Sequence, residues 1–195
     1  MRTLLISVVA ILGLAFATVA SAGIPSASTS TVVAVGEGTP ACNPNTAVVC
    51  PAGDLGWVKV TVTVRNIYGD PLPGKIVNCY AMPVAPAVFC FCPGEDPQSG
   101  TTDINGEAIF YYTYFGGCGD LQWGADSDGI VFNPSNIIYI ASPDNDGDCD
   151  VDLADFGGFA SSYLTSDPCS DFDCSGVVDL PDFGVFANHY FHTCP

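Results

Sequence analysis

Hydrophobic and polar residues alternate along the first part of the chain, most regularly in WVKVTVTVRNIYG at residues 57–69. In an extended chain, Val58, Val60, Val62 and Val64 lie on one face, and polar or basic residues occupy the other. A period of two is typical of a β-strand with one buried face. The pattern therefore predicts a half-buried strand that begins near residue 57.

Further short strands are expected on both sides of this segment. Gly and Pro residues follow it in YGDPLPG, and Asn105-Gly106 is a dipeptide that favours a tight turn between strands. About seven short strands with a turn roughly every ten residues are typical of a β-sandwich. The other expected strands lie at residues 30–35, 75–82, 87–92, 107–115, 120–125 and 135–142.

The period changes after Pro143, where one unit occurs twice at an offset of 27 residues. VDLADFGGFASSY (151–163) and VDLPDFGVFANHY (178–190) are identical at nine of thirteen positions. Apolar residues in each copy recur at helical spacing, so a small module of two helices is expected. The apolar positions are Leu153, Phe156, Phe159, Ala160, Tyr163 and Leu164, and their counterparts Leu180, Phe183, Phe186, Ala187, Tyr190 and Phe191.

An acidic loop precedes each predicted helix. EF-hand loops bind calcium through oxygen atoms at positions 1, 3, 5, 7, 9 and 12, position 7 contributing its backbone carbonyl. Both loops fit this spacing, and its duplication favours two Ca²⁺ sites over a solvated acidic surface. The predicted ligands are Asp144, Asp146, Asp148, the Asp150 carbonyl, Asp152 and Asp155, then Asp171, Asp173, Ser175, the Val177 carbonyl, Asp179 and Asp182.

The charge of the chain narrows the choice of partners. Its 195 residues include 21 Asp and Glu but only four Lys and Arg, which gives a net charge of −17. Such an acidic surface repels nucleic acids and anionic membranes. Divalent cations and basic protein surfaces are therefore the expected partners.

The first 22 residues have the three-part pattern of a secretory signal peptide. One Arg precedes an apolar stretch, and the small residues Ala20-Ser21-Ala22 predict cleavage after Ala22. No later stretch is long and apolar enough to cross a bilayer, so membrane insertion is not expected. The expected product is secreted or cell-surface, with a β-domain over residues 23–142 and a calcium module over residues 143–195.

All ten cysteines follow the predicted signal peptide, and an even number in an exported chain favours disulfides. Spacing of the kind found in zinc sites is lacking, because Cys90 and Cys92 are the one close pair. Within the β-domain, the expected bonds are Cys42–Cys50 and two among Cys79, Cys90, Cys92 and Cys118, with the three pairings open. In the calcium module, antiparallel helices would favour Cys149–Cys194 and Cys169–Cys174.

Two motifs in the β-domain resemble a known family. VTVRNIYGDPLPGKIV, followed by GTTDINGEAIF, is similar to the bacterial immunoglobulin-like domains of adhesins and secreted modular proteins. The resemblance covers residues 28–142 and implies an immunoglobulin-like sandwich that acts as a spacer, an adhesive tip or a building block.

The tandem loop–helix repeats resemble a dockerin, the calcium-dependent docking module of cellulosome-type assemblies. Asp155 and Asp182 stand at position 12, as in dockerins, whereas Cys149 occupies position 6 of the first loop, where Gly is usual. Thrombospondin type 3 repeats share the acidic run but lack the helices. The dockerin resemblance implies a cohesin-like partner contacting positions 10 and 11, which here are Leu153, Ala154, Leu180 and Pro181.

No group of residues indicates catalysis, and no enzymatic activity is expected. The chain has three glutamates, and most aspartates belong to the predicted calcium loops, which leaves no carboxylate pair for a glycosidase. His189 and His192 are expected on the surface near the last helix. Core packing is favoured over a sugar-binding platform for the aromatic residues Trp57, Trp123, Tyr111 and Tyr112.

Three non-enzymatic functions remain open. The first is a docking adaptor in a polysaccharide-degrading or cell-surface assembly, with the β-domain as a spacer or binding unit. The second is a self-assembling subunit of an extracellular filament or surface layer, stabilised by calcium and disulfides. The third is a carbohydrate-binding accessory protein. The adaptor is favoured by analogy with the architecture of docking proteins.

Overall fold

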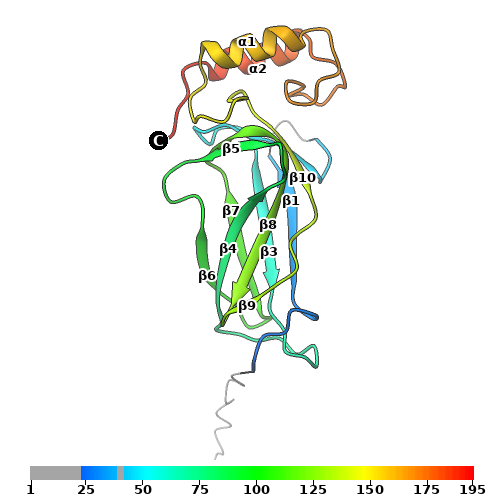
Figure 1. Ribbon diagram of the computed structural model, residues 1–195, viewed down its shortest axis with the longest axis vertical. Coiled ribbons are helices and arrows are strands. Elements are labelled where there is room, and N and C mark those ends of the chain that lie inside the picture. Colours follow the sequence, from blue (N-terminus) through cyan, green and yellow to red (C-terminus); the bar gives the residue numbers. More distant parts are fainter. Residues whose placement is uncertain (1–22, 39–41) are drawn as a thin grey trace, which may run out of the picture.

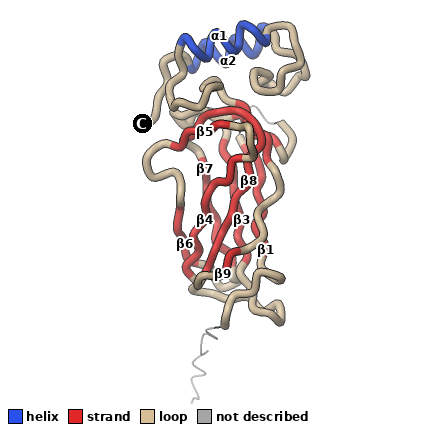
Figure 2. The backbone as a smooth tube through the Cα atoms, in the orientation of Figure 1, coloured by secondary structure: helices blue, strands red, loops and turns tan. Residues whose placement is uncertain are grey.

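The computed structural model describes residues 23–38 and 42–195, and the predicted signal peptide lies outside the described residues. The described chain is mostly β, with two helices near the C-terminus (Figure 1). The strands lie in two sheets, and the helices cover one end of them (Figure 2). Within the described residues, no helix combines the length and apolar character needed to cross a membrane.

The first sheet contains the strand predicted from alternation. Its order is β1 (Thr31–Glu37), β3 (Trp57–Thr63) and β7 (Glu107–Tyr112), and both pairings are antiparallel. Val58, Val60, Val62 and Val64 are all completely buried, as predicted. Period-two alternation therefore identified the core face of this sheet correctly.

The second sheet is built around one long strand, β8 (Phe115–Ser127). The sheet order is β2 (Thr46–Val48), β10 (Ile138–Ala141), β8, β4 (Ile76–Pro83) and β6 (Gln98–Thr101). Two short strands, β5 (Val88–Phe91) and β9 (Ile130–Val131), also pair with β8. The β2–β10 pair is parallel and the other pairs are antiparallel.

Side chains from both sheets form one hydrophobic core. The rings of Tyr112 on β7 and Trp123 on β8 lie 5.4 Å apart and are both fully buried. This confirms core packing for these two aromatic residues. Tyr111 is half exposed, because it points to the opposite face of β7, so its assignment to the core was wrong.

The two helices match the repeated pattern. Helix α1 (Leu153–Ser162) and helix α2 (Leu180–His189) begin at equivalent positions of the two repeats. An Asp precedes each helix and forms a capping box with the Asp three residues later, which satisfies backbone N–H groups at the helix start. The rings of Phe159 and Phe186 stack 5.4 Å apart and hold the helices together.

The helical module shares a second core with the end of the two-sheet region. Phe159, Phe172 and Phe186 pack in one cluster with Val48, Cys50 and Ala141. The helices cover this end of the sheets, and the sheets cover the buried side of the helices. The two regions are therefore joined by buried apolar surface as well as by chain connectivity.

Four disulfides join the two-sheet region to the helical module, and none forms within either part. Each expected pairing was therefore wrong: Cys42–Cys50, bonds among Cys79, Cys90, Cys92 and Cys118, Cys149–Cys194, and Cys169–Cys174. Those pairings assumed that each part closes on itself, whereas the loops of the module pack against the sheet end. The bonds are Cys42–Cys174, Cys90–Cys149, Cys92–Cys194 and Cys118–Cys169, and Cys50 and Cys79 are buried thiols.

Candidate metal centre

The first acidic loop brings three predicted ligands together. Asp144, Asp146 and Asp155 each offer a carboxylate oxygen, and these three oxygens lie within 4.8 Å of one another. The residues occupy positions 1, 3 and 12 of the loop. The spacing read from the sequence therefore corresponds to a real cluster of oxygen donors.

Backbone N–H groups of the same loop hold two of these carboxylates in place. Asp144 accepts hydrogen bonds from the N–H groups of Gly147, Asp148 and Cys149 at 2.9–3.1 Å. Asp155 accepts from Asn145, Asp146 and Asp152 at 2.7–3.2 Å. The loop is thus wrapped around its carboxylates, and Asp144 and Asp155 have almost no exposed surface.

The second loop repeats this arrangement. Oxygens of Asp171, Asp173 and Asp182 lie within 4.8 Å of one another, again at positions 1, 3 and 12. Asp182 is completely buried and accepts from the N–H groups of Asp173 and Asp179. Two equivalent acidic clusters therefore precede the two helices.

Position 6 of each loop requires an unusual backbone conformation. Gly176 has φ of 92°, a region that glycine enters without steric cost. Cys149 occupies the same position in the first loop with φ of 77°, which is uncommon for a residue with a side chain. Its disulfide to Cys90 anchors this strained position to strand β5.

Three other predicted carboxylate ligands lie outside the two clusters. Asp152 accepts a hydrogen bond from the N–H of Ala154 and caps α1. In the second loop, the Ser175 hydroxyl donates to the Val177 carbonyl at 3.0 Å, so that two predicted ligands contact each other. The predicted carboxylate ligands outside the clusters are Asp148, Asp152 and Asp179, whereas the Asp150 carbonyl, the Ser175 hydroxyl and the Val177 carbonyl stay predictions.

Burial leaves the acidic clusters with uncompensated charge. Desolvation raises the pKa of Asp144 from 3.8 to about 7, and it also raises the pKa values of Asp146, Asp155 and Asp171. The described basic side chains lie elsewhere: Lys59 and Lys75 pair with Glu37 and Asp128, and Arg65 donates to the Gly69 carbonyl. Clusters of oxygen donors with this charge fit a hard divalent cation.

The helices following the clusters expose apolar surface. Leu153 and Leu180, the predicted partner-binding residues at position 10, are 70% and 67% exposed, and Ala154 and Pro181 are exposed too. Two shallow grooves of about 310 and 290 Å³ are lined entirely by residues of the two repeats. The lining residues are Leu153, Phe156, Phe159, Ala160, Tyr163, Leu180, Phe183, Phe186, Ala187 and Tyr190.

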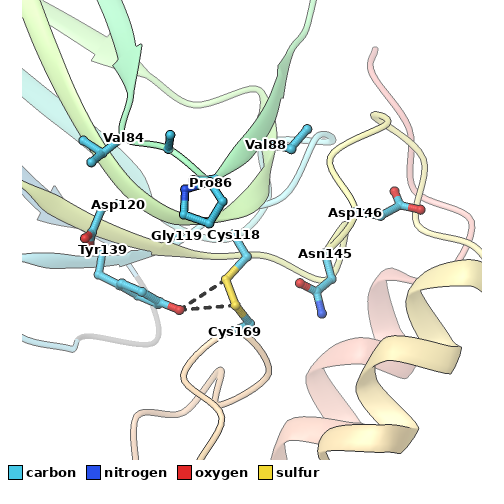
Figure 3. Close-up of a pocket in the computed structure, with 12 residues that line it drawn as sticks. Val84, Pro86, Val88, Cys118, Gly119, Asp120, Tyr139, Asn145, Asp146 and Cys169 are labelled. Atoms are coloured by element: carbon cyan, nitrogen blue, oxygen red, sulfur yellow. Dashed lines mark hydrogen bonds between the residues drawn. A yellow bond between two sulfur atoms is a disulfide. The ribbon is translucent and has the colours of Figure 1, made fainter.

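A larger hollow of about 480 Å³ lies where the first acidic loop meets the two-sheet region (Figure 3). Val84 and Pro86 line it from the connection between β4 and β5, Val88 lines it from β5, and Asn145 and Asp146 line it from the loop. The Cys118–Cys169 disulfide also lines the hollow, within hydrogen-bonding reach of the Tyr139 hydroxyl. The hollow therefore marks the seam between the two parts.

The chain matches no protein-family model, and no curated protein shows significant similarity to it.

Proposed function

We propose that this chain is a secreted, non-catalytic protein whose C-terminal module binds two Ca²⁺ ions and docks to a partner protein through its two helices. One observation carries the proposal: the apolar faces of α1 and α2 are exposed directly beside two matched clusters of carboxylates. The resemblance to dockerins adds a class of partner, a cohesin-like domain. The two-sheet region, in our interpretation immunoglobulin-like, serves as a rigid support.

Calcium binding and helix position are coupled through two residues. Asp155 and Asp182 each contribute to an acidic cluster and to the capping box of the helix that follows. An ion held at these carboxylates would remove the repulsion within each cluster and fix the first turn of each helix. The docking face would then be ordered only when both loops are filled.

Charge favours a partner of different composition over a second copy of this chain. Its net charge is −17, and the acidic loops border the exposed apolar residues. Two such surfaces repel each other, whereas an apolar patch rimmed by Lys and Arg is complementary to this one. Self-assembly into a filament or layer is therefore the less favourable alternative.

Calcium titration of the oxidised mature protein tests the first half of the proposal. Heat release and particle mass should show two bound ions and no growth in size. Asp155→Asn and Asp182→Asn should each remove one ion, whereas Asp70→Asn, in a turn of the two-sheet region, should leave two. An unchanged heat of binding in both loop variants would exclude the proposed sites, and growth in mass with calcium would favour the structural subunit.

A cohesin domain is the probe for the second half. It should bind in calcium and dissociate in chelator, and the double variant Leu153→Asp/Leu180→Asp should abolish binding. Ile104→Asp is the matched control, because Ile104 is 82% exposed on a turn far along the chain from the helices. Equal loss of binding in the control, or binding that persists in the double variant, would contradict docking through this face.

A further inference from the structure

The only two histidines of the chain meet a buried thiol and a carboxylate at the seam between the two parts. The Nδ1 atom of His192 lies 3.1 Å from Asp54 Oδ2 and 4.0 Å from Cys50 Sγ. The Nε2 atom of His189 lies 3.6 Å from Asp54 Oδ1, and the two imidazole rings are 5.1 Å apart. Residues separated by up to 142 positions thus form one compact cluster.

Backbone contacts hold this cluster in place. The Gly53 N–H donates to the Cys50 carbonyl at 2.8 Å and closes the turn that carries Cys50 and Asp54. On the other side, the Val151 N–H donates to the His192 carbonyl at 2.9 Å. The Cys92–Cys194 disulfide follows two residues after His192. The geometry is therefore set by the fold and not by mobile side chains alone.

The hydrogen bond of His189 determines which of its ring nitrogens is available. Its Nδ1 lies 2.6 Å from the Val185 carbonyl, which accepts hydrogen bonds only, so Nδ1 carries the proton. In the neutral ring, Nε2 then has a lone pair, and it faces a carboxylate oxygen. Two such acceptors require a proton or a cation between them. A histidine that donates its other N–H to a carbonyl is typical of metal ligation.

The donor atoms indicate the class of metal. One sulfur, two imidazole nitrogens and a carboxylate suit zinc, whereas calcium prefers oxygen ligands throughout. Zinc bonds of about 2.0–2.3 Å place the corners of a tetrahedron about 3.3–3.8 Å apart. The separations of 3.1 Å from His192 Nδ1 to Asp54 Oδ2 and of 4.0 Å from His192 Nδ1 to Cys50 Sγ lie close to this range. Cys50 has no exposed surface, which makes it a poor nucleophile for substrates.

We propose that Cys50, Asp54, His189 and His192 bind one Zn²⁺ ion, separately from the acidic loops. Cys50 Sγ, His192 Nδ1 and one Asp54 oxygen, which all lie within 4.8 Å of one another, form the base of the site. His189 Nε2, 3.6 Å from the other Asp54 oxygen, lies outside this group of three and is the proposed fourth ligand, which moves towards the ion when it binds. Binding releases the Cys50 proton to solvent, because the thiolate is the ligand form. The ion links the 50–54 turn to the end of α2.

Metal titration of the full oxidised mature protein tests this site. The acidic loops are first saturated with calcium, and Zn²⁺ is then titrated by calorimetry. Co²⁺ serves as a spectroscopic probe, since a thiolate ligand gives a charge-transfer band in the near ultraviolet. We expect one tight Zn²⁺ ion and a Co²⁺ band, with affinity at least tenfold weaker in Cys50→Ser and in His192→Gln.

Cys79→Ser is the matched control, because Cys79 is the other buried thiol of the described chain and lies in a different core cluster. It should retain both zinc affinity and the Co²⁺ band. Retention of the four disulfides by mass and a native near-ultraviolet spectrum would show that each variant has folded. If Cys50→Ser does not fold, the zinc affinities of His192→Gln and Asp54→Asn test the site in its place. Absence of zinc binding in the unaltered protein, or equal affinity in these variants and the control, would overturn the proposal and leave an Asp54–histidine ion-pair cluster.

Discussion

Asp144 is a carboxylate without exposed surface that accepts hydrogen bonds from three backbone N–H groups and lies beside the carboxylates of Asp146 and Asp155. Its position 1 in the loop, like positions 3 and 12, could be read from the sequence because ligand spacing is local. Positions 5 and 9 were not confirmed in the same way, since the carboxylates of Asp148, Asp152 and Asp179 lie outside the two clusters, and the carbonyl at position 7 stays a prediction. Positions 1, 3 and 12 of each loop are therefore the best-supported calcium ligands.

The raised pKa of Asp144 predicts how the calcium-free protein responds to pH. Because its pKa rises from 3.8 to about 7 on folding, the folded state holds a proton that the unfolded state has lost. The free energy of unfolding should then be greatest below about pH 4 as far as this group is concerned, and should fall as pH rises towards 7. Urea unfolding in chelator at a series of pH values measures this slope.

Calcium and substitution provide the controls for this experiment. Saturating calcium should abolish the fall in stability, since the ion stabilises the ionised carboxylate. Asp144→Asn should flatten the pH dependence in chelator, whereas Asp70→Asn should not. A slope that is the same in Asp144→Asn and in the unaltered protein would assign it to other groups.

The two thiols give a second prediction at the scale of single residues. Burial raises the pKa of Cys50 to about 12 and that of Cys79 to about 11, so both are protonated and shielded at neutral pH. A thiol reagent should find no reactive cysteine in the native protein and two in denaturant with chelator. Either no thiol or four thiols in denaturant would contradict the disulfide pattern.

Among the elements, those with a strong local pattern were the predictable ones. Strand β3 alternates without interruption, and each helix combines helical periodicity with a capping Asp. The strands β2, β6 and β9 were missed, because they are two to four residues long and QSGT in β6 has no apolar position. Such strands form because long neighbours offer unpaired backbone groups, which no local pattern encodes.

Helix packing predicts unequal costs for two apolar substitutions in α1. Phe159 is 3% exposed and stacks with Phe172 and Phe186, so Phe159→Ala should lower the free energy of unfolding by about 3–5 kcal/mol. Leu153 is 70% exposed, and Leu153→Ala should change the free energy of unfolding by less than about 0.5 kcal/mol. Urea unfolding in calcium measures both, and similar values would contradict the packing described here.

At the scale of the whole molecule, the sequence was least informative about how its two parts are joined. The change of period at Pro143 predicted where the helical module begins, but disulfide partners depend on which surfaces meet after folding. The cluster of Cys50, Asp54, His189 and His192 escaped sequence analysis for the same reason, since the histidines lie more than 130 residues from Cys50. Contacts between residues this far apart in the sequence can be identified only once the folded structure is known.

The long loops closed by the disulfides predict a large contribution to stability. Cys118 and Cys169 are 51 residues apart, and closing such a loop restricts the unfolded chain. The double variant Cys118→Ser/Cys169→Ser should lower the free energy of unfolding by about 2–5 kcal/mol. Cys79→Ser, which removes a thiol but no bond, is the control, and an equal loss in both would contradict the assignment.

The disulfide pattern also imposes an order of events on biosynthesis. Cys42, Cys90, Cys92 and Cys118 are synthesised before Cys149, Cys169, Cys174 and Cys194, because a chain is made from its N-terminus. Any bond formed among the first group is non-native and must be exchanged later. Native oxidation therefore cannot begin before Cys149 has been made and cannot finish before Cys194, and a chain that stops short of Cys149 contains no native cysteine pair.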